Sequence, residues 1–258
     1  MSYIIFKTRG PVGFVTLNRP ARLNTVTRKM LDELGRVFER IRLERELRAV
    51  ILTGAGERAF CAGTDIDELA RLDVEGARSA AERGQRVCEL IERCDVPVIA
   101  AVNGLAAGGG CELALACHLR LASTGAVFSL PEIKLGLIPA YGGTQRLARL
   151  IGSPRAYELL LTGAQLSAED AFRTGLVNRI LAASQLLFEA EALAEQIAQL
   201  APLATRACLE AVTRGVDLPL AEGLALEAEL FSQLFSTEDV REGTRAFLEK
   251  RAPVFKGK

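Results

Sequence analysis

The most informative segment reads Val102-Asn103-Gly104-Leu105-Ala106-Ala107-Gly108-Gly109-Gly110-Cys111-Glu112. The apolar run before it, residues 96–101, is typical of a buried strand, and the run after it, residues 113–117, is typical of a helix. A glycine-rich turn is therefore predicted to join a strand to a helix, with Glu112 in the first turn of that helix. Free backbone N–H groups at such a turn bind an anion or a developing oxyanion, and glycine lets a ligand approach the backbone closely.

Phosphate binding is the first alternative for this turn. A P-loop ends in Gly-Lys-Ser/Thr, but no lysine follows here, and the Gly-x-Gly-x-x-Gly spacing of dinucleotide sites is absent. Glu112 would also repel a bound phosphate. A second alternative stays open, because glycine-rich turns are common: the segment is a tight turn that only packs the helix on the strand.

A second turn of the same kind follows another predicted buried strand, residues 48–53. After it, the small residues 59–65 are predicted to form a loop that leads into a short helix over 66–72. Thr64 or Asp65 is able to cap that helix. Two such loops on neighbouring strands would aim two backbone N–H groups at one point, which is the geometry of an oxyanion hole.

A second carboxylate lies downstream in an apolar segment. Glu132 follows Pro131 directly, which places it at a predicted helix start. Burying a glutamate among apolar residues costs free energy unless it has a partner or a chemical role. Glu132 therefore pairs with Lys134, caps the helix at the surface, or faces the same site as Glu112. In the last case two glutamates beside an oxyanion hole suit general acid–base chemistry next to a thioester carbonyl.

Together these segments resemble the crotonase, or enoyl-CoA hydratase/isomerase, superfamily. The match covers nearly the whole chain in the expected order: Asn18-Arg19-Pro20 with Leu23-Asn24, then 59–66, 102–117, 130–139, 142–147 and 238–258. The resemblance implies an α/β fold built as a spiral of ββα units with a C-terminal helical oligomerisation region. It also implies homotrimers, commonly paired into homohexamers, and an acyl-CoA thioester substrate in which coenzyme A is part of the substrate rather than a separate cofactor.

The resemblance further implies roles for individual residues. The two oxyanion-hole N–H groups correspond to Ala62 and Gly109, and each such donor lowers the barrier by about 3–4 kcal/mol. The two hydratase glutamates correspond to Glu112, the base that activates a water, and Glu132, which delivers a proton to the α-carbon. The substrate- and CoA-binding positions correspond to Arg22, Leu23, Ala59, Gly63, Thr64, Asp65, Ile66, Gly108, Pro131, Ala140 and Tyr141.

Two positions depart from the family pattern. His118 stands where aspartate is usual, and Tyr141 stands where a small residue is usual. If the tyrosine ring points inward it narrows or gates the acyl pocket; otherwise it packs against the C-terminal helices. Arg22 either meets a CoA phosphate or stays solvated.

The resemblance thus predicts reversible hydration of a trans-2-enoyl-CoA to a 3-hydroxyacyl-CoA, the work of a carbon–oxygen lyase. One alternative is a family isomerase, which commonly keeps only the second glutamate. Another is a hydratase for a branched or dicarboxylic acyl-CoA such as methylglutaconyl-CoA, and a third is a non-catalytic CoA-ester- or RNA-binding member. A Ser or Cys hydrolase would depend on His118, the only histidine, for which a structural or helix-terminal role is the simpler interpretation.

Composition narrows these possibilities. The 258 residues are 49% hydrophobic and 25% charged, and their formal net charge of zero argues against a nucleic-acid partner. No apolar run reaches the ~20 residues of a membrane span, and no signal or transit peptide is recognised, so we expect a cytoplasmic protein without a membrane partner. Six cysteines without a Cys-x-x-Cys pair indicate buried free thiols rather than a metal site.

The chain is predicted to have two parts. Residues 1–195 alternate strands, glycine turns and helices, and form the core that binds the CoA ester and carries the catalytic residues. Its further strands are expected at 3–7 and 12–17, which form a hairpin, and at 98–102, 119–122 and 177–180. Residues 196–258 are wholly helical, with helices at 200–214, 220–235 and 237–250. Their apolar residues exceed what one helix face requires and indicate a subunit interface: Leu224, Leu226, Leu230, Phe231, Leu234 and Phe235.

Overall fold

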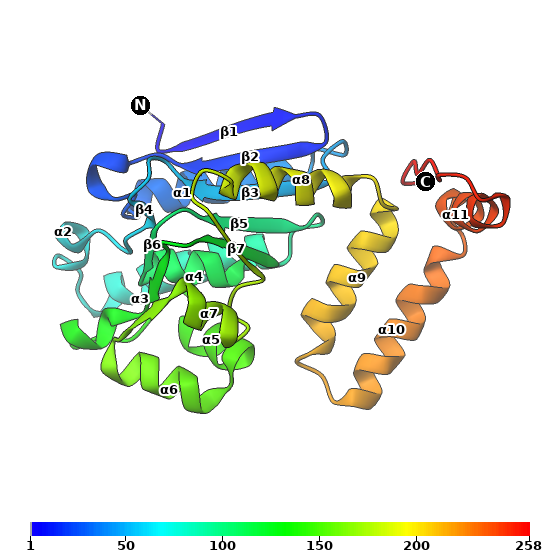
Figure 1. Cartoon of the computed structure of the whole chain (residues 1–258). Coiled ribbons are helices and arrows are strands. Elements are labelled where there is room, and N and C mark those ends of the chain that lie inside the picture. Colours follow the sequence, from blue (N-terminus) through cyan, green and yellow to red (C-terminus); the bar gives the residue numbers. More distant parts are fainter. Residues whose placement is uncertain (1) are drawn as a thin grey trace.

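The computed structural model describes residues 2–258, which form two sheets and the helices around them (Figure 1). The larger sheet has the order β1 (Ile4–Arg9), β2 (Val12–Leu17), β3 (Ala49–Gly54), β5 (Val98–Val102), β7 (Leu119–Ser123), β10 (Arg179–Leu181). The smaller sheet has the order β4 (Ala59–Cys61), β6 (Leu105–Ala107), β8 (Val127–Ser129), β9 (Gln165–Ser167). β1 and β2 form the predicted antiparallel hairpin, and the other neighbours in the larger sheet are parallel. The predicted α/β fold is confirmed.

Successive ββα units build the spiral. Each unit begins with a strand of the larger sheet, continues with a short strand of the smaller sheet and ends in a helix. The units are β3–β4–α3 (Val74–Glu92), β5–β6–α4 (Gly109–Ala116) and β7–β8–α5 (Gly143–Ile151). β4 and β6 are hydrogen-bonded neighbours, so the two loops that were predicted to converge do leave adjacent strands.

Two segments predicted as loops contain a strand. Residues 59–61 form β4, and β6 interrupts the turn between β5 and α4. Both strands have 3 residues, which is too short for an alternating pattern to show in the sequence. The helix after β4, α2 (Ile66–Leu69), ends earlier than predicted, and Asp65 caps it by accepting the Asp67 N–H at 3.0 Å.

The core lies on both faces of the larger sheet. On one face, Val50 and Leu52 of β3 pack in the cluster that includes α1 (Arg28–Ile41), α3 and α4. On the other face, Ile51 and Ile99 pack with the α8 (Leu186–Ala198) residue Ala190, and α8 lies along the sheet in Figure 1. Since successive side chains of a strand point to opposite faces, β3 and β5 are buried on both sides and hold the site loops rigidly.

The remaining helices complete the chain. The chain also has two short 3₁₀ turns, η1 (Pro20–Arg22) and η2 (Pro131–Leu135), and two helices, α6 (Ser153–Thr162) and α7 (Ala168–Arg173). α6 contacts η2, and α7 contacts β8 and β9 of the smaller sheet. α9 (Pro202–Gly215), α10 (Leu220–Leu234) and α11 (Glu238–Glu249) project away from the sheets (Figure 1) and confirm the predicted C-terminal helices. The predicted boundary after residue 195 falls inside α8, so the projecting part begins later, at α9.

The predicted interface residues, five in α10 and Phe235 directly after it, are unevenly exposed. Leu226 is buried, Leu230 and Leu234 are half-buried, and Leu224, Phe231 and Phe235 are exposed. Large apolar side chains of this helix therefore face solvent in the single chain. No helix within residues 2–258 combines the length and the apolar character needed to cross a bilayer.

Candidate active site

A cleft of about 480 Å³ opens between α2, α3, η2 and the start of α4. Most of the predicted site residues line it: Ala62, Gly63, Thr64, Ile66, Gly108, Glu112, Pro131, Glu132, Ala140 and Tyr141. The rest of the wall is largely apolar, with Leu69 and Leu72 on one side and Leu137 and Ile138 on the other. The sequence prediction did not identify these four wall residues, because apolar residues of this kind also form the core.

The other predicted positions lie outside the cleft wall. Arg22 is exposed at the end of η1, and Ala59 is buried within β4. Asp65 is buried and paired with Arg19 at 2.6 Å, which, with its contact to Asp67, lowers the pKa of its carboxyl. Leu23 and Gly109 border the site through their backbone, as described below.

Each glycine of the turn before α4 meets a different neighbour. Gly108 has φ +50, and a Cβ there would lie 2.7 Å from Glu132 Oε1. A Cβ at Gly109 would lie 2.7 Å from the ring of Tyr141, and one at Gly110 would overlap the carbonyl of Cys61. The turn therefore both packs α4 tightly on β4 and brings its backbone up to two of the predicted site side chains.

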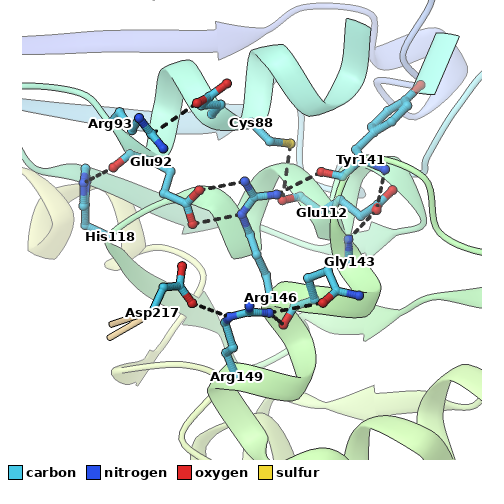
Figure 2. Close-up of polar contacts among 12 residues, drawn as sticks. Cys88, Glu92, Arg93, Glu112, His118, Tyr141, Gly143, Arg146, Arg149 and Asp217 are labelled. Atoms are coloured by element: carbon cyan, nitrogen blue, oxygen red, sulfur yellow. Dashed lines mark hydrogen bonds and ion pairs between the residues drawn. The ribbon is translucent and has the colours of Figure 1, made fainter. Parts of the chain in front are cut away.

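Glu112 is held in the first turn of α4, where it is 2% exposed. Its Oε1 accepts two hydrogen bonds at 2.7 Å, from the N–H groups of Tyr141 and Gly143 (Figure 2). Burial raises the pKa of Glu112 to about 7, with a further contribution from Glu132, although the two N–H donors favour the charged form. A carboxyl group with this pKa is able to take up and release a proton near neutral pH.

Glu132 shares the cleft with Glu112. Its Oε2 is buried and has no hydrogen-bond partner within residues 2–258, and no ion pair to Lys134 forms in this part of the chain. Burial raises the pKa of Glu132. Of the three roles open to Glu132 from the sequence, the pairing and the surface cap are not observed, and the side chain faces the same site as Glu112.

The predicted oxyanion donor Ala62 needs correction. Its N–H donates to the Leu23 carbonyl at 3.0 Å, so it is not free to bind a ligand. Leu23 and Asn24 both have positive φ, and the buried Asn24 side chain fixes this loop by donating to the carbonyls of Ala55 and Ala59 at 2.9 Å. The Ala62 amide is therefore already hydrogen-bonded to the loop at η1.

The Thr64 N–H is a better candidate, because no backbone group within residues 2–258 accepts from it. The parallel bridge between Val26 and Thr64 uses the Gly63 carbonyl and the Asp65 N–H, so the Thr64 N–H points away from Val26. The Thr64 side chain lies beside Gly109, whose own N–H begins α4 and has no partner inside the helix. Thr64 lines the cleft, and Gly109 lies directly behind the Thr64 side chain, so the N–H groups of these two residues are the candidate backbone donors at this point.

The Tyr141 ring points inward. It is 5% exposed, and a Cβ at Gly84 of α3 or at Gly109 of α4 would collide with it. Its hydroxyl lies 3.1 Å from Thr64 Oγ1. The sequence left two positions open for this ring, and the structure places it beside the glycine turn and away from α9–α11.

His118 has a structural position. Its Nδ1 accepts the Val98 N–H at 2.9 Å, its Nε2 lies 3.0 Å from the Glu92 carbonyl, and burial lowers its pKa. With both ring nitrogens bound to backbone groups, His118 has no ring nitrogen left to act as a base. Burial also raises the pKa of the Cys61 thiol to about 12, and that of Cys111 is raised as well, so neither supplies a thiolate nucleophile.

No group of three or more His, Cys, Asp or Glu side chains is arranged to hold a metal ion within residues 2–258. All six cysteines are unbonded to one another, and only Cys208 is exposed.

Comparisons with known proteins agree with this fold and show the family. The family model for enoyl-CoA hydratase/isomerase matches residues 7–258. The short-chain-enoyl-CoA hydratase of Clostridium acetobutylicum is 42% identical, over 97% of this chain and 96% of the relative. The crotonyl-CoA hydratase of Syntrophomonas wolfei is 39% identical, over 98% and 97% of the two chains. The crystal structure of an enoyl-CoA hydratase from Bacillus anthracis superposes with a TM-score of 0.96 at 42% identity, covering 99% of this chain and all of that one. This chain belongs to the enoyl-CoA hydratase/isomerase family.

Proposed function

We propose that this protein is an enoyl-CoA hydratase, which adds water reversibly to a trans-2-enoyl-CoA to give a 3-hydroxyacyl-CoA. The observation that carries the proposal is the presence of two carboxyl groups in one apolar cleft: Glu112 is buried, and Glu132 is half-buried with its Oε2 buried. The activities in the names of the Clostridium and Syntrophomonas relatives support the same reaction. Double-bond isomerisation is the second candidate within the family, and it needs only one of the two glutamates.

In the proposed reaction the thioester oxygen lies between the N–H groups of Thr64 and Gly109. As the enolate forms, negative charge develops on that oxygen, and each donor stabilises it by about 3–4 kcal/mol. This assignment replaces Ala62 by Thr64, because the Leu23 carbonyl occupies the Ala62 amide.

With the help of the two glutamates, the hydroxyl group of water adds to the β-carbon of the substrate and a proton adds to the α-carbon. Glu112, fixed by the amides of Tyr141 and Gly143, accepts a proton from the water while the hydroxyl adds to the β-carbon. Glu132 delivers a proton to the α-carbon, and its unpartnered Oε2 suits an oxygen that binds the reacting water. The pKa of about 7 keeps both protonation states of Glu112 accessible near neutral pH, and burial raises the pKa of Glu132 in the direction that favours its protonated, proton-donating form.

The proposal also covers the binding of coenzyme A, the oligomeric state and the location of the enzyme. Coenzyme A enters as part of the acyl-CoA substrate, with no separate cofactor or metal, and exposed Arg22 and half-buried Leu23 at η1 contact it outside the apolar cleft. The exposed apolar side chains of α10 are covered in a homotrimer or homohexamer. We place the enzyme in the cytoplasm.

The test is a spectrophotometric assay with crotonyl-CoA and longer trans-2-enoyl-CoAs, following loss of the absorbance of the conjugated thioester. Hydration is expected, and the product should run back to the same equilibrium from 3-hydroxybutyryl-CoA. The matched measurement uses a 3-enoyl-CoA, whose conversion to the conjugated isomer would raise the absorbance. Isomerisation without hydration would overturn the proposal in favour of the second candidate.

A further inference from the structure

Arg146 of α5 lies directly behind the turn that holds Glu112. Its Nε and Nη2 donate to the two carboxylate oxygens of Glu92 at 3.0 and 2.7 Å, and its Nη1 donates to the Tyr141 carbonyl at 2.9 Å (Figure 2). Only 16% of the Arg146 side chain is exposed. A paired, planar contact of this kind fixes the guanidinium in direction as well as position.

The turn that Arg146 contacts carries both donors to Glu112. The Tyr141 N–H and the Gly143 N–H meet at Glu112 Oε1, and Gly142 between them has φ +105. A Cβ at Gly142 would overlap the Arg146 guanidinium, so the turn lies against it. Gly142 is the N-cap of α5, and its carbonyl accepts the N–H groups of Gln145 and Arg146 at 3.1 and 2.9 Å. Tyr141 lies before the helix, so its peptide group is not held by the hydrogen bonds of α5, and the Arg146 guanidinium holds its carbonyl instead.

We infer that Arg146, clamped by Glu92, is a positioning residue for the hydration reaction, because it holds the 141–143 turn with both amides aimed at Glu112. The inference rests on the proposed role of Glu112 as the base. Arg146 touches the carbonyl of the turn and does not line the substrate cleft.

The charged surroundings of Glu112 give the direction of the expected effect. Glu132 on η2 favours the neutral carboxyl, while Arg146 on α5 and the two turn amides favour the carboxylate. The thiol of Cys88 on α3 and the phenol of Tyr141 also face it, and burial raises the pKa of each, so both stay neutral. Removing the Arg146 charge and loosening the turn both favour protonated Glu112. The acid limb of the kcat profile should therefore move to higher pH, by about 1 unit.

The experiment compares Arg146→Gln and Arg146→Lys with Arg149→Gln as the matched control. Arg149 lies nearby on the same helix, is 54% exposed and pairs with Asp217 at 3.0 Å, away from the turn. We expect Arg146→Gln to lower kcat by about 10- to 100-fold with little change in KM, and to shift the acid limb upward. Arg146→Lys should recover part of the rate, and Arg149→Gln should leave rate and pH profile unchanged.

A direct titration separates the inference from the proposed function. The pKa of Glu112 is measured by NMR of carboxyl-labelled glutamate in the wild type and in Arg146→Gln, with Glu92→Gln as the second variant if Arg146→Gln does not fold. An unchanged Glu112 titration in a folded variant overturns the positioning role, whatever the enzyme's activity. A shifted titration in a protein that does not hydrate any enoyl-CoA supports the positioning of Glu112 and contradicts only the hydratase assignment.

Discussion

Replacing Tyr141 by alanine is expected to lengthen the acyl pocket and to weaken the fold at the same time. The ring fills the space between Gly84 and Gly109, and it also lines the cleft. Removing a buried aromatic ring costs about 3–5 kcal/mol of unfolding free energy. The space it leaves adjoins the cleft, and an apolar contact with a longer acyl chain there is worth about 1–3 kcal/mol, or about 10- to 200-fold in kcat/KM.

The assay is a chain-length series of crotonyl-CoA, hexenoyl-CoA and decenoyl-CoA, run beside denaturant unfolding and a measurement of oligomer mass. The wild type should prefer the short chains, and Tyr141→Ala should gain most on the longest. Tyr141→Phe is the control, because it keeps the ring and loses only the contact between the hydroxyl and Thr64. It should cost about 0.5–1.5 kcal/mol of stability and leave the chain-length profile unchanged.

The backbone amide of residue 141 remains in both variants, so crotonyl-CoA hydration should survive in each. If folded Tyr141→Ala shows the chain-length profile of the wild type, the ring does not limit the pocket and the reasoning is refuted. If the variant loses its oligomer as well, the ring acts on the assembly instead.

Three further predictions concern Glu112, Glu132 and His118. Glu112→Gln and Glu132→Gln should each lower kcat by about 10²–10⁴-fold in steady-state kinetics, while a binding titration shows that the acyl-CoA still binds. The double variant should lose far less rate than the two single losses combined. Near-normal hydration by either single variant would remove that residue from the mechanism. Burial raises the pKa of Glu112 from 4.5 to about 7, so its contribution to the unfolding free energy is full below pH 4.5 and falls by about 3 kcal/mol as the pH rises to about 7. In Glu112→Gln the unfolding free energy should lose this part of its pH dependence. An unchanged pH dependence would contradict the raised pKa. His118→Asn should keep kcat within about tenfold and lower the unfolding free energy by about 1–3 kcal/mol, and a much larger loss of rate at unchanged stability would reopen the hydrolase alternative.

The local sequence pattern was enough to predict the strands, the glycine turn and the helix that carry Glu112. The apolar runs around β3 and β5 and the glycines before α4 are signals within a few residues of one another, and they placed Glu112 correctly in the first turn of α4. The C-terminal helices were predictable for the same reason, since each carries its own apolar period.

Contacts between distant segments were not predictable in this way. Ala62 looked available because its partner, the Leu23 carbonyl, comes from a loop that pairs with it only in the fold. The fit of Tyr141 against Gly84 likewise joins a turn to a helix far away in the sequence, and a lone glycine in a helix gives no sign of which side chain it accommodates. Arg146 belonged to a matched segment, but only its contacts with Glu92 and Tyr141 suggest a role for it.

The glycine turn before α4 also limits how this scaffold can be re-engineered. Gly108, Gly109 and Gly110 each leave room for a group from a different part of the chain, so a side chain added to any of them displaces the Glu132 carboxyl, the Tyr141 ring or the Cys61 carbonyl. A designer who wants a new acyl specificity should therefore keep the turn fixed and vary the apolar walls around Leu72 and Ile138. Moving the turn into another protein would require transferring its three neighbours with it.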